Sequence, residues 1–325
     1  MLTDEPLTTP VLFLIYNRPE ITLRVFNEIK KAKPSSLFVS ADGPRQEKPR
    51  DAELCRLTRE IINQVDWNCK VHTNFHHENV GLKNAVSSGI NWFFESVVSG
   101  IILEDDCLPS QSFFWFCQQL LRRYHDDNRI MQISGSNFLF GKKVTEASYC
   151  FAKLNDIQGW ATWKRAWDFY DIQMKSYPKF KEQGQINNYL DDREMQEWLM
   201  SYFEQDYKLS CGHKGLWSSQ WSYAMSAQNG LTIVPSKNLV LPIGFTSEAT
   251  HGGESFQLYT TVDLQEMNEI VHPIFILPNK QMDRLRFEVI KKTDPRLVYA
   301  TRNKMKAFSR RFLPAVLYDY VKRFL

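Results

Sequence analysis

The chain has 325 residues, of which 43% are hydrophobic and 24% are charged, as in ordinary globular proteins with a real core. This composition excludes a disordered chain and a collagen-like repeat. Lysine and arginine number 40 against 37 acidic residues, a formal net charge of +3, so no nucleic-acid partner is expected from the total charge. Aromatic residues reach 14%, an excess suited to stacking on sugars or bases.

Six cysteines are scattered along the chain without a CxxC pair or a metal-ligand spacing, so free thiols are expected rather than a zinc site or a redox dithiol. Residues 1–10 are polar and lack a basic stretch before an apolar one, which predicts that there is no signal peptide. No apolar run approaches the roughly 20 residues that a membrane helix requires. A cytoplasmic location is therefore expected.

The first 130 residues alternate between predicted strands and predicted helices. Short apolar runs predict strands at 11–16, 37–40, 70–74 and 100–103. Apolar residues at helical spacing predict helices at 20–31, 51–65 and 82–97. This alternation is typical of βαβ units and predicts an α/β fold with a mostly parallel sheet flanked by helices. After residue 130 the pattern loosens into tryptophan-rich loops and shorter strands, at 130–133, 231–234 and 239–241.

Polar side chains follow three of the predicted strands: Asn17 and Arg18, then Asp42, then the triplet Glu104-Asp105-Asp106. In a mostly parallel sheet, ligands bind beyond the carboxyl ends of the strands. The predicted fold therefore brings all three groups to one edge of the sheet.

The acidic triplet has two interpretations. Three adjacent carboxylates repel one another unless a cation or a set of donors neutralises them, and carboxylate oxygens suit Mg²⁺ or Mn²⁺. Such a metal, if it also held a diphosphate, would neutralise the charge on a leaving nucleotide. Alternatively, the triplet is a solvated acidic turn that caps the following helix. The neighbouring polar groups favour the metal site.

The other groups at this edge carry alternatives of their own. Asp42 is expected either to accept hydrogen bonds from a base or a ribose hydroxyl or to form an Asx turn before Gly43. Arg18 is expected to contact a phosphate or a base carbonyl, with a plain surface charge as the alternative. Lys83, at the start of a predicted helix, has the same two interpretations.

Several short motifs occur in a specific order: Tyr16-Asn17-Arg18-Pro19, Ser40-Ala41-Asp42-Gly43, Asn79-Val80-Gly81-Leu82-Lys83, Ile101 to Asp106, Asn155 to Trp160, and Ala249-Thr250-His251-Gly252. Together they resemble bacterial nucleotide-sugar glycosyltransferases of the GT-A fold, relatives of the N-acetylglucosaminyltransferase I family. The resemblance covers about residues 10–255. It implies a GT-A domain at 1–285, with a nucleotide-binding part at about 10–130 and an acceptor-side part at about 131–285.

The resemblance implies roles for individual residues. Asn17, Arg18, Asp42 and Lys83 would bind the nucleotide, and Glu104 and Asp105 would contact the ribose and the sugar. Asp106 would ligate Mn²⁺ or Mg²⁺, and His251 would add a metal or phosphate contact, with a structural role as its alternative. Gly159 and Trp160 would shape the wall where donor sugar and acceptor meet, with core packing as the alternative for Trp160.

The sequence departs from this pattern at one point. An inverting glycosyltransferase needs a general base, and an Asp is expected between the tryptophans at 217 and 221. Ser218 and Ser219 stand there instead. Asp156 and Glu248 lie within motifs that should reach the site, so they are the candidate catalytic bases.

The C-terminal region has a different composition. Residues 291–325 hold ten basic and two acidic residues, a net +8, and the first 290 residues hold 30 against 35, a net −5. Apolar residues between the basic ones indicate an amphipathic helical tail, assigned to 286–325. Residues 300–325 would lie on an anionic membrane surface, or the helix would pack on the enzyme or on a second copy.

The sequence thus predicts a metal-dependent inverting glycosyltransferase that moves a sugar from a nucleotide diphosphate, with a UDP-sugar favoured, to a hydroxyl of a glycan or lipid-linked glycan in surface polysaccharide synthesis. The alternative is a non-catalytic sugar-nucleotide or glycan-binding module of the same fold. A nucleotidyltransferase would share the sheet, but the chain lacks a Gly-rich phosphate loop near its first strand.

Overall fold

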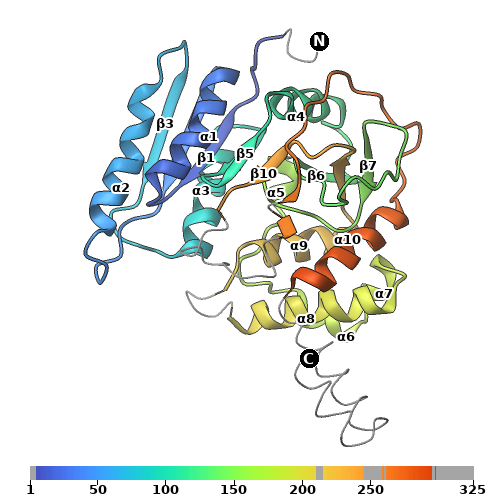
Figure 1. The fold of residues 1–325 in the computed structure, drawn as a ribbon. Coiled ribbons are helices and arrows are strands. Elements are labelled where there is room, and N and C mark those ends of the chain that lie inside the picture. Colours follow the sequence, from blue (N-terminus) through green and yellow to red (C-terminus); the bar gives the residue numbers. More distant parts are fainter. Residues whose placement is uncertain (1–4, 210–214, 245–257, 260, 295–296, 298–325) are drawn as a thin grey trace, which may run out of the picture.

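The computed structural model describes residues 5–209, 215–244, 258–259, 261–294 and 297 (Figure 1). Its centre is an eight-stranded sheet with the strand order β3-β2-β1-β4-β8-β6-β9-β7. The strands of this sheet are β1 (Val11–Ile15), β2 (Ser36–Ala41), β3 (Lys70–Phe75), β4 (Ser99–Glu104), β6 (Ile130–Ser134), β7 (Tyr149–Ala152), β8 (Trp160–Trp163) and β9 (Leu231–Pro235). A second, two-stranded sheet joins β5 (Cys107–Pro109) to β10 (Val240–Pro242).

The first four strands of the main sheet are parallel to one another, as the sequence predicts. The helices between them are α1 (Pro19–Ala32), α2 (Asp51–Glu60) and α3 (Leu82–Ser96). The helix predicted at 51–65 ends at Glu60 and continues as a short 3-10 helix, η1 (Ile61–Gln64). Only β8 and β7 run against the other strands of this sheet. The α/β class with a mostly parallel, Rossmann-like sheet is therefore confirmed.

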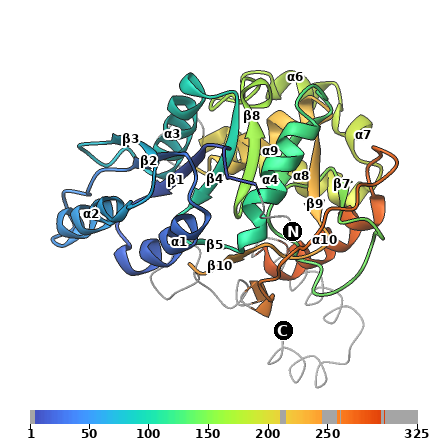
Figure 2. The same ribbon diagram turned by 90° about the horizontal axis from the view of Figure 1, so that it is seen from above.

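Helices cover both faces of the sheet (Figure 2). Alternate residues of β1 explain why, because Val11, Phe13 and Ile15 join one buried cluster while Leu12 and Leu14 join another. The first cluster contains apolar residues of α1 and of α4 (Gln111–Arg123), and the second contains those of α3. Both faces of β1 are thus buried, which accounts for its uninterrupted apolar sequence.

The second half of the chain completes the sheet and adds helices beside it. Strand β8 inserts antiparallel between β4 and β6. The strand predicted at 239–241 forms as β10, but it pairs with β5 outside the main sheet. The remaining helices are α5 (Lys164–Trp167), α6 (Tyr177–Glu182), α7 (Ile186–Tyr189), α8 (Arg193–Leu209), α9 (Ser218–Ala227) and α10 (Lys280–Thr293).

Helices α6, α7 and α8 share a third buried cluster with Phe287 of α10. The boundary predicted at 285/286 falls inside α10, and Arg286 and Phe287, just beyond it, are 7% and 2% exposed. The packed region therefore continues past that position. The division into two domains stays a prediction, since 298–325 lie outside the described residues.

Five of the six cysteines lie in the described part of the chain, and all five are free thiols. Of the helices described, none has both the length and the apolar character needed to cross a bilayer.

Candidate functional site

The acidic triplet lies where β4 ends, beside the start of α1. Glu104 is the last residue of β4 and pairs in register with Leu14 of β1. Arg18, the residue before α1, reaches across to the other two acids. Its Nε donates to Asp105 Oδ2 over 3.3 Å, and its Nη2 donates to Asp106 Oδ2 over 3.1 Å and to Asp105 Oδ1. The predicted convergence of Arg18 with the triplet is thus present in the structure.

Two of the three acids of the triplet lie in surroundings that disfavour their ionised form. Burial, helped by the carboxylates of Asp106 and Asp105, raises the pKa of Glu104 well above its ordinary value. Burial also raises the pKa of Asp105, although the Arg18 guanidinium opposes that shift. Both shifts favour the neutral acid over the carboxylate at these two positions.

Asp106 is the most accessible aspartate of the triplet, with 30% of its side chain exposed. Its backbone carbonyl accepts a hydrogen bond from Ile243 over 2.8 Å, which ties the turn to the chain that leaves β10. Gly244 approaches so closely that a Cβ on it would lie 2.1 Å from Asp106 Oδ2. The position of the Asp106 carboxylate therefore requires a glycine at residue 244.

The chemistry of the donor set fits a divalent cation only in part. In the part of the chain that the structure describes, no group of three His, Cys, Asp or Glu side chains converges as a metal site. Asp106 is one exposed carboxylate, and a cation would need further oxygen ligands from a bound diphosphate. His251, the other predicted ligand, and Glu248, a predicted base, lie outside the described residues.

Asp42 organises a loop at the same edge of the sheet. Its Oδ1 accepts from the backbone nitrogens of Gly43 and Val80, and its Oδ2 accepts from Gly81 N and from Asn79 Nδ2, all over 2.8–3.1 Å. The Gly43 bond spans one residue and not the two of an Asx turn, and the same carboxylate also holds the loop before α3. Gly81 has φ +81°, a conformation that favours glycine.

Asp51 is a buried hub that the sequence analysis missed. It accepts hydrogen bonds from Tyr16 Oη and Asn17 Nδ2, each over 2.7 Å, and it binds Arg45 through Nε over 2.8 Å and Nη2 over 2.9 Å. These donors, with Arg45 first, lower the pKa of Asp51 far below its ordinary value. Asn79 also donates to Tyr16 Oη over 3.1 Å, so this hub is joined to the Asp42 loop.

The hub has a structural consequence for the predicted nucleotide-binding residues. Asn17 is held by Asp51 on one side of the edge, and Arg18 is held by the triplet on the other. As an acid at the start of a helix, Asp51 looks like a residue that favours the helix dipole, and this hides its role in the sequence. Lys83, in the first turn of α3, is 2% exposed, and its part in nucleotide binding stays a prediction.

Trp160 does not form an exposed wall, contrary to the role expected for it. It is 0% exposed and packs against Trp217, with ring centroids 5.9 Å apart and planes 20° apart. The physical reason is that β8 is an interior strand covered by α9, so its side chains face the core. Trp163, Trp167 and Trp221 are buried as well, so these tryptophans serve packing and not acceptor stacking.

Gly159, the residue before β8, lies where the backbone packs closely against β10. It has φ +64°, and a Cβ on it would lie 2.7 Å from the side chain of Val240. Its carbonyl accepts from Gly135 N over 2.8 Å. Glycine is thus required here for close approach of the backbone, as expected, while the contact is with β10 and not with a sugar.

A cavity of about 720 Å³ opens beside this edge, bounded by residues 153–158 and by α8, α9 and α10. That volume is typical of a small-molecule site. Its lining mixes polar and aromatic groups, among them Asn155, Asp156, Gln158, Trp198, Tyr202, Gln205, Asp206, Ser218, Ser222 and Arg286. Leu82, which follows the Asp42 loop, also lines it, so the cavity adjoins the predicted nucleotide-binding edge.

Asp156, the second candidate base, lies in this cavity but is not free. Arg286 Nε donates to its Oδ2 over 2.8 Å, and Arg286 Nη2 donates to its Oδ1. The two side chains are 12% and 9% exposed. Of the two serines that replace the expected acid, Ser218 lines the cavity, whereas Ser219 is 0% exposed.

Comparisons with known proteins add little to this geometry. No family model matches the chain, and no curated protein matches it. Among solved structures, HddC from Yersinia pseudotuberculosis shares 10% identity over 45% of this chain and 60% of its own, with a TM-score of 0.27. A UDP-glucose pyrophosphorylase complexed with UDP-glucose shares 11% over 46% and 58%, with a TM-score of 0.25. This chain thus spans less than two thirds of either structure, and likenesses of this size carry no argument about its function.

Proposed function

We propose that the protein is a metal-dependent inverting glycosyltransferase that moves a sugar from a UDP-sugar to a hydroxyl of a glycan acceptor in surface polysaccharide synthesis. The proposal is carried by the adjacency of two sites. The acidic triplet bound to Arg18 follows β4, and Leu82, next to the loop that Asp42 holds, lines a polar, aromatic cavity of about 720 Å³. One site suits the diphosphate end of a donor, and the other suits a polyhydroxylated acceptor.

The donor end rests on the residues at the carboxyl ends of β1, β2 and β4. Asn17, Arg18 and Asp42 would hold the base and ribose, with Asp51 keeping the first of them in place. Glu104 and Asp105 would contact the ribose and the sugar. Asp106 would be the protein ligand of Mn²⁺ or Mg²⁺. When bound there, the metal would neutralise charge on the departing nucleoside diphosphate.

Inversion by direct displacement requires a base that takes the proton of the acceptor hydroxyl. Asp156 is the candidate within the described residues, because it lines the cavity and Arg286 fixes the position of its carboxylate. Asp206 lines the same cavity and serves as the matched alternative. Asp156→Asn is expected to abolish transfer without changing the affinity for UDP, whereas Asp206→Asn keeps transfer.

A second candidate function is a non-catalytic sugar-nucleotide or glycan-binding module. One observation favours it: Ser218 occupies the cavity position where an acid was expected, and Asp156 has both carboxylate oxygens bonded to Arg286. Such a module would bind UDP and would never release it from a UDP-sugar.

One experiment separates the two functions. The full chain is incubated with a panel of nucleotide sugars and Mn²⁺, and released nucleoside diphosphate is measured with and without metal. Metal-dependent release from one donor, lost in Asp106→Asn, supports the enzyme. UDP binding by calorimetry without release from any donor supports the module. Absence of both nucleotide binding and release would overturn both proposals.

The cellular setting belongs to the same proposal. A cytoplasmic enzyme with a lipid-linked acceptor would meet it at the inner face of a membrane, and residues 300–325 would supply the contact. These residues lie outside the described part of the chain. Deleting them should abolish sedimentation with anionic vesicles and leave donor hydrolysis intact; unchanged sedimentation would contradict the membrane contact.

A further inference from the structure

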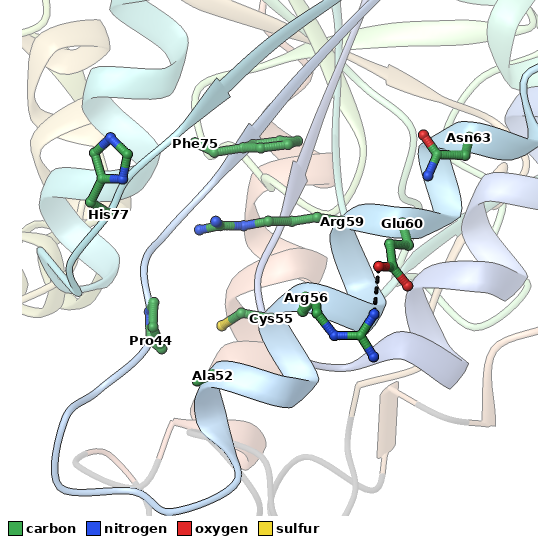
Figure 3. Close-up of a pocket in the computed structure, with 9 residues that line it drawn as sticks. All are labelled: Pro44, Ala52, Cys55, Arg56, Arg59, Glu60, Asn63, Phe75 and His77. Carbon is green, nitrogen blue, oxygen red and sulfur yellow. Dashed lines mark hydrogen bonds and ion pairs between the residues drawn. The ribbon is translucent and has the colours of Figure 1, made fainter.

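A second cavity, of about 410 Å³, lies between α2 and the end of β3 (Figure 3). One face of α2 and η1 forms one wall, and the end of β3 with the loop after it forms the other. The lining residues are Pro44, Ala52, Cys55, Arg56, Arg59, Glu60, Asn63, Phe75 and His77. We call it the α2 pocket. None of its residues belongs to the proposed donor or acceptor site.

Arg59 is the central group of the α2 pocket. Its Nη2 donates to the backbone carbonyls of Asp42 and His76, over 2.9 and 2.8 Å. Its guanidinium carbon lies 4.9 Å from the centre of the Phe75 ring, and Figure 3 shows the guanidinium beneath that ring. These contacts fix the guanidinium in one position, so an incoming ligand would not have to order it.

The charge of Arg59 is not compensated. Among the described residues no carboxylate pairs with Arg59, and its buried Nε has no hydrogen-bond partner. Arg56 of the same wall, by contrast, is neutralised by Glu53 and Glu60. A guanidinium bonded only to carbonyls favours an anion with several acceptor oxygens.

The other residues that line the α2 pocket indicate what kind of anion it would accept. Glu60 and Asn63 offer a carboxylate and an amide to hydroxyl groups at the rim. Phe75, Pro44 and Ala52 offer apolar surface for the body of a small molecule. Burial raises the pKa of the Cys55 thiol to about 11, so that group is a neutral part of the wall and not a nucleophile.

We propose that the α2 pocket binds a small phosphate monoester of the size of a hexose phosphate, with Arg59 contacting the phosphate and Glu60 and Asn63 contacting hydroxyls. Such a ligand would be connected to the proposed donor site through Asp42. Arg59 holds the carbonyl of Asp42, and the Asp42 carboxylate holds the loop at Val80 and Gly81. Binding in the pocket would therefore stiffen the loop that meets the nucleotide.

The binding test uses the full chain and isothermal titration calorimetry with glucose-6-phosphate and with inorganic phosphate, with glucose as the uncharged probe. Wild type is expected to bind glucose-6-phosphate with a dissociation constant on the order of 1 mM or below and to show no binding of glucose. No binding of glucose-6-phosphate, or equal binding of glucose, would overturn the proposal, as would binding of inorganic phosphate alone.

Three variants place the ligand. Arg59→Met removes the guanidinium, and Ala52→Trp fills the pocket from an exposed position on α2. Each should weaken glucose-6-phosphate binding about tenfold or more, the loss expected for a charge-assisted contact. Arg24→Met, at an exposed arginine of α1 outside the pocket, is the matched control and should change nothing.

Two controls address misfolding of a variant and binding of the phosphate at the acidic edge. If Arg59→Met fails to fold, Ala52→Trp decides alone, and unchanged binding by that variant overturns the proposal. Excess UDP should leave the bound glucose-6-phosphate in place; displacement by UDP would assign the phosphate to the acidic edge and also overturn it. Binding is measured without turnover, so this test is independent of the proposed enzyme activity.

Discussion

Arg286 and Asp156 form a buried ion pair that joins α10 to the loop before β8, across 130 positions of sequence. The guanidinium also lies over two aromatic rings, 5.0 Å from the centre of Phe138 and 5.5 Å from that of Tyr259. One arginine thereby ties α10 to the wall of the larger cavity. The pair also fixes the orientation of a candidate base.

Removing either partner of this pair should be costly, because the other charge is left buried and alone. Arg286→Met and Asp156→Asn are each expected to lower the free energy of unfolding by about 3–5 kcal/mol. The double variant should lose much less than the sum of the two. Urea denaturation of the four proteins measures the coupling. Lys164→Met, in an exposed pair with Asp168, is the control and should cost about 1 kcal/mol or less. Additive losses would show that the pair contributes no coupling.

Arg18 occupies the carboxylates that the proposed metal would need. Since it bonds to both Asp105 and Asp106, a cation must compete with a guanidinium that is already in place. Arg18→Met is therefore expected to bind Mn²⁺ more tightly than wild type in the absence of nucleotide, by about tenfold. The same change should weaken UDP binding. Calorimetry with Mn²⁺ alone and with UDP alone measures the two effects; equal Mn²⁺ affinity in both proteins would contradict the competition.

Gly244 is expected to control the position of Asp106. A methyl group there would meet Asp106 Oδ2 at 2.1 Å and its Cβ at 2.7 Å, closer than real contacts allow. Gly244→Ala should therefore displace the carboxylate and reduce Mn²⁺ affinity in the presence of UDP by about tenfold or more, the same effect that is expected of Asp106→Asn. The melting temperature should change little, because the clash is with a partly exposed side chain. Normal metal binding in Gly244→Ala would show that Asp106 is not the ligand.

The nucleotide-side half of the fold could be predicted from sequence because its strands are buried on both faces. Val11–Ile15 and Ile101–Leu103 are continuous apolar runs, and parallel pairing of such runs places the residues that follow them at one edge. This is why the meeting of Arg18 with Asp105 and Asp106 was foreseeable. The parallel order of the strands is enough to predict this meeting, although the residues are far apart in the sequence.

Other parts of the site depend on contacts that no local pattern encodes. Asp51 looks like a helix-start acid, yet it binds Tyr16 and Asn17 from 35 and 34 positions away. Trp160 belongs to a four-residue strand, too short for its period to separate an interior position from an exposed one. Its burial follows from the insertion of β8 between β4 and β6, a topological fact. Sequence reasoning therefore predicted the meeting of polar residues at the edge of the sheet, and it did not predict the burial of Trp160.

Asp283 should make the stability of the protein depend on pH. The side chain is 4% exposed and accepts hydrogen bonds from the backbone nitrogens of Lys153 and Leu154. Burial raises its pKa from 3.8 to about 6, although these bonds and the Lys153 charge oppose the shift. Because the pKa is higher in the folded state, the folded protein holds a proton that the unfolded chain releases between about pH 4 and pH 6.

Rising pH must therefore cost stability across that window, and the loss is complete above the folded pKa. From pH 4 to pH 7, wild type is expected to lose about 3 kcal/mol of unfolding free energy relative to Asp283→Asn, whose amide keeps an acceptor and cannot ionise. Denaturant melts of both proteins at several pH values give the difference directly. Asp168→Asn, at an exposed position, controls for the loss of one charge. A wild-type-minus-variant difference that stays flat from pH 4 to pH 7 would mean that Asp283 is ionised throughout, held by its two backbone donors more strongly than burial opposes it.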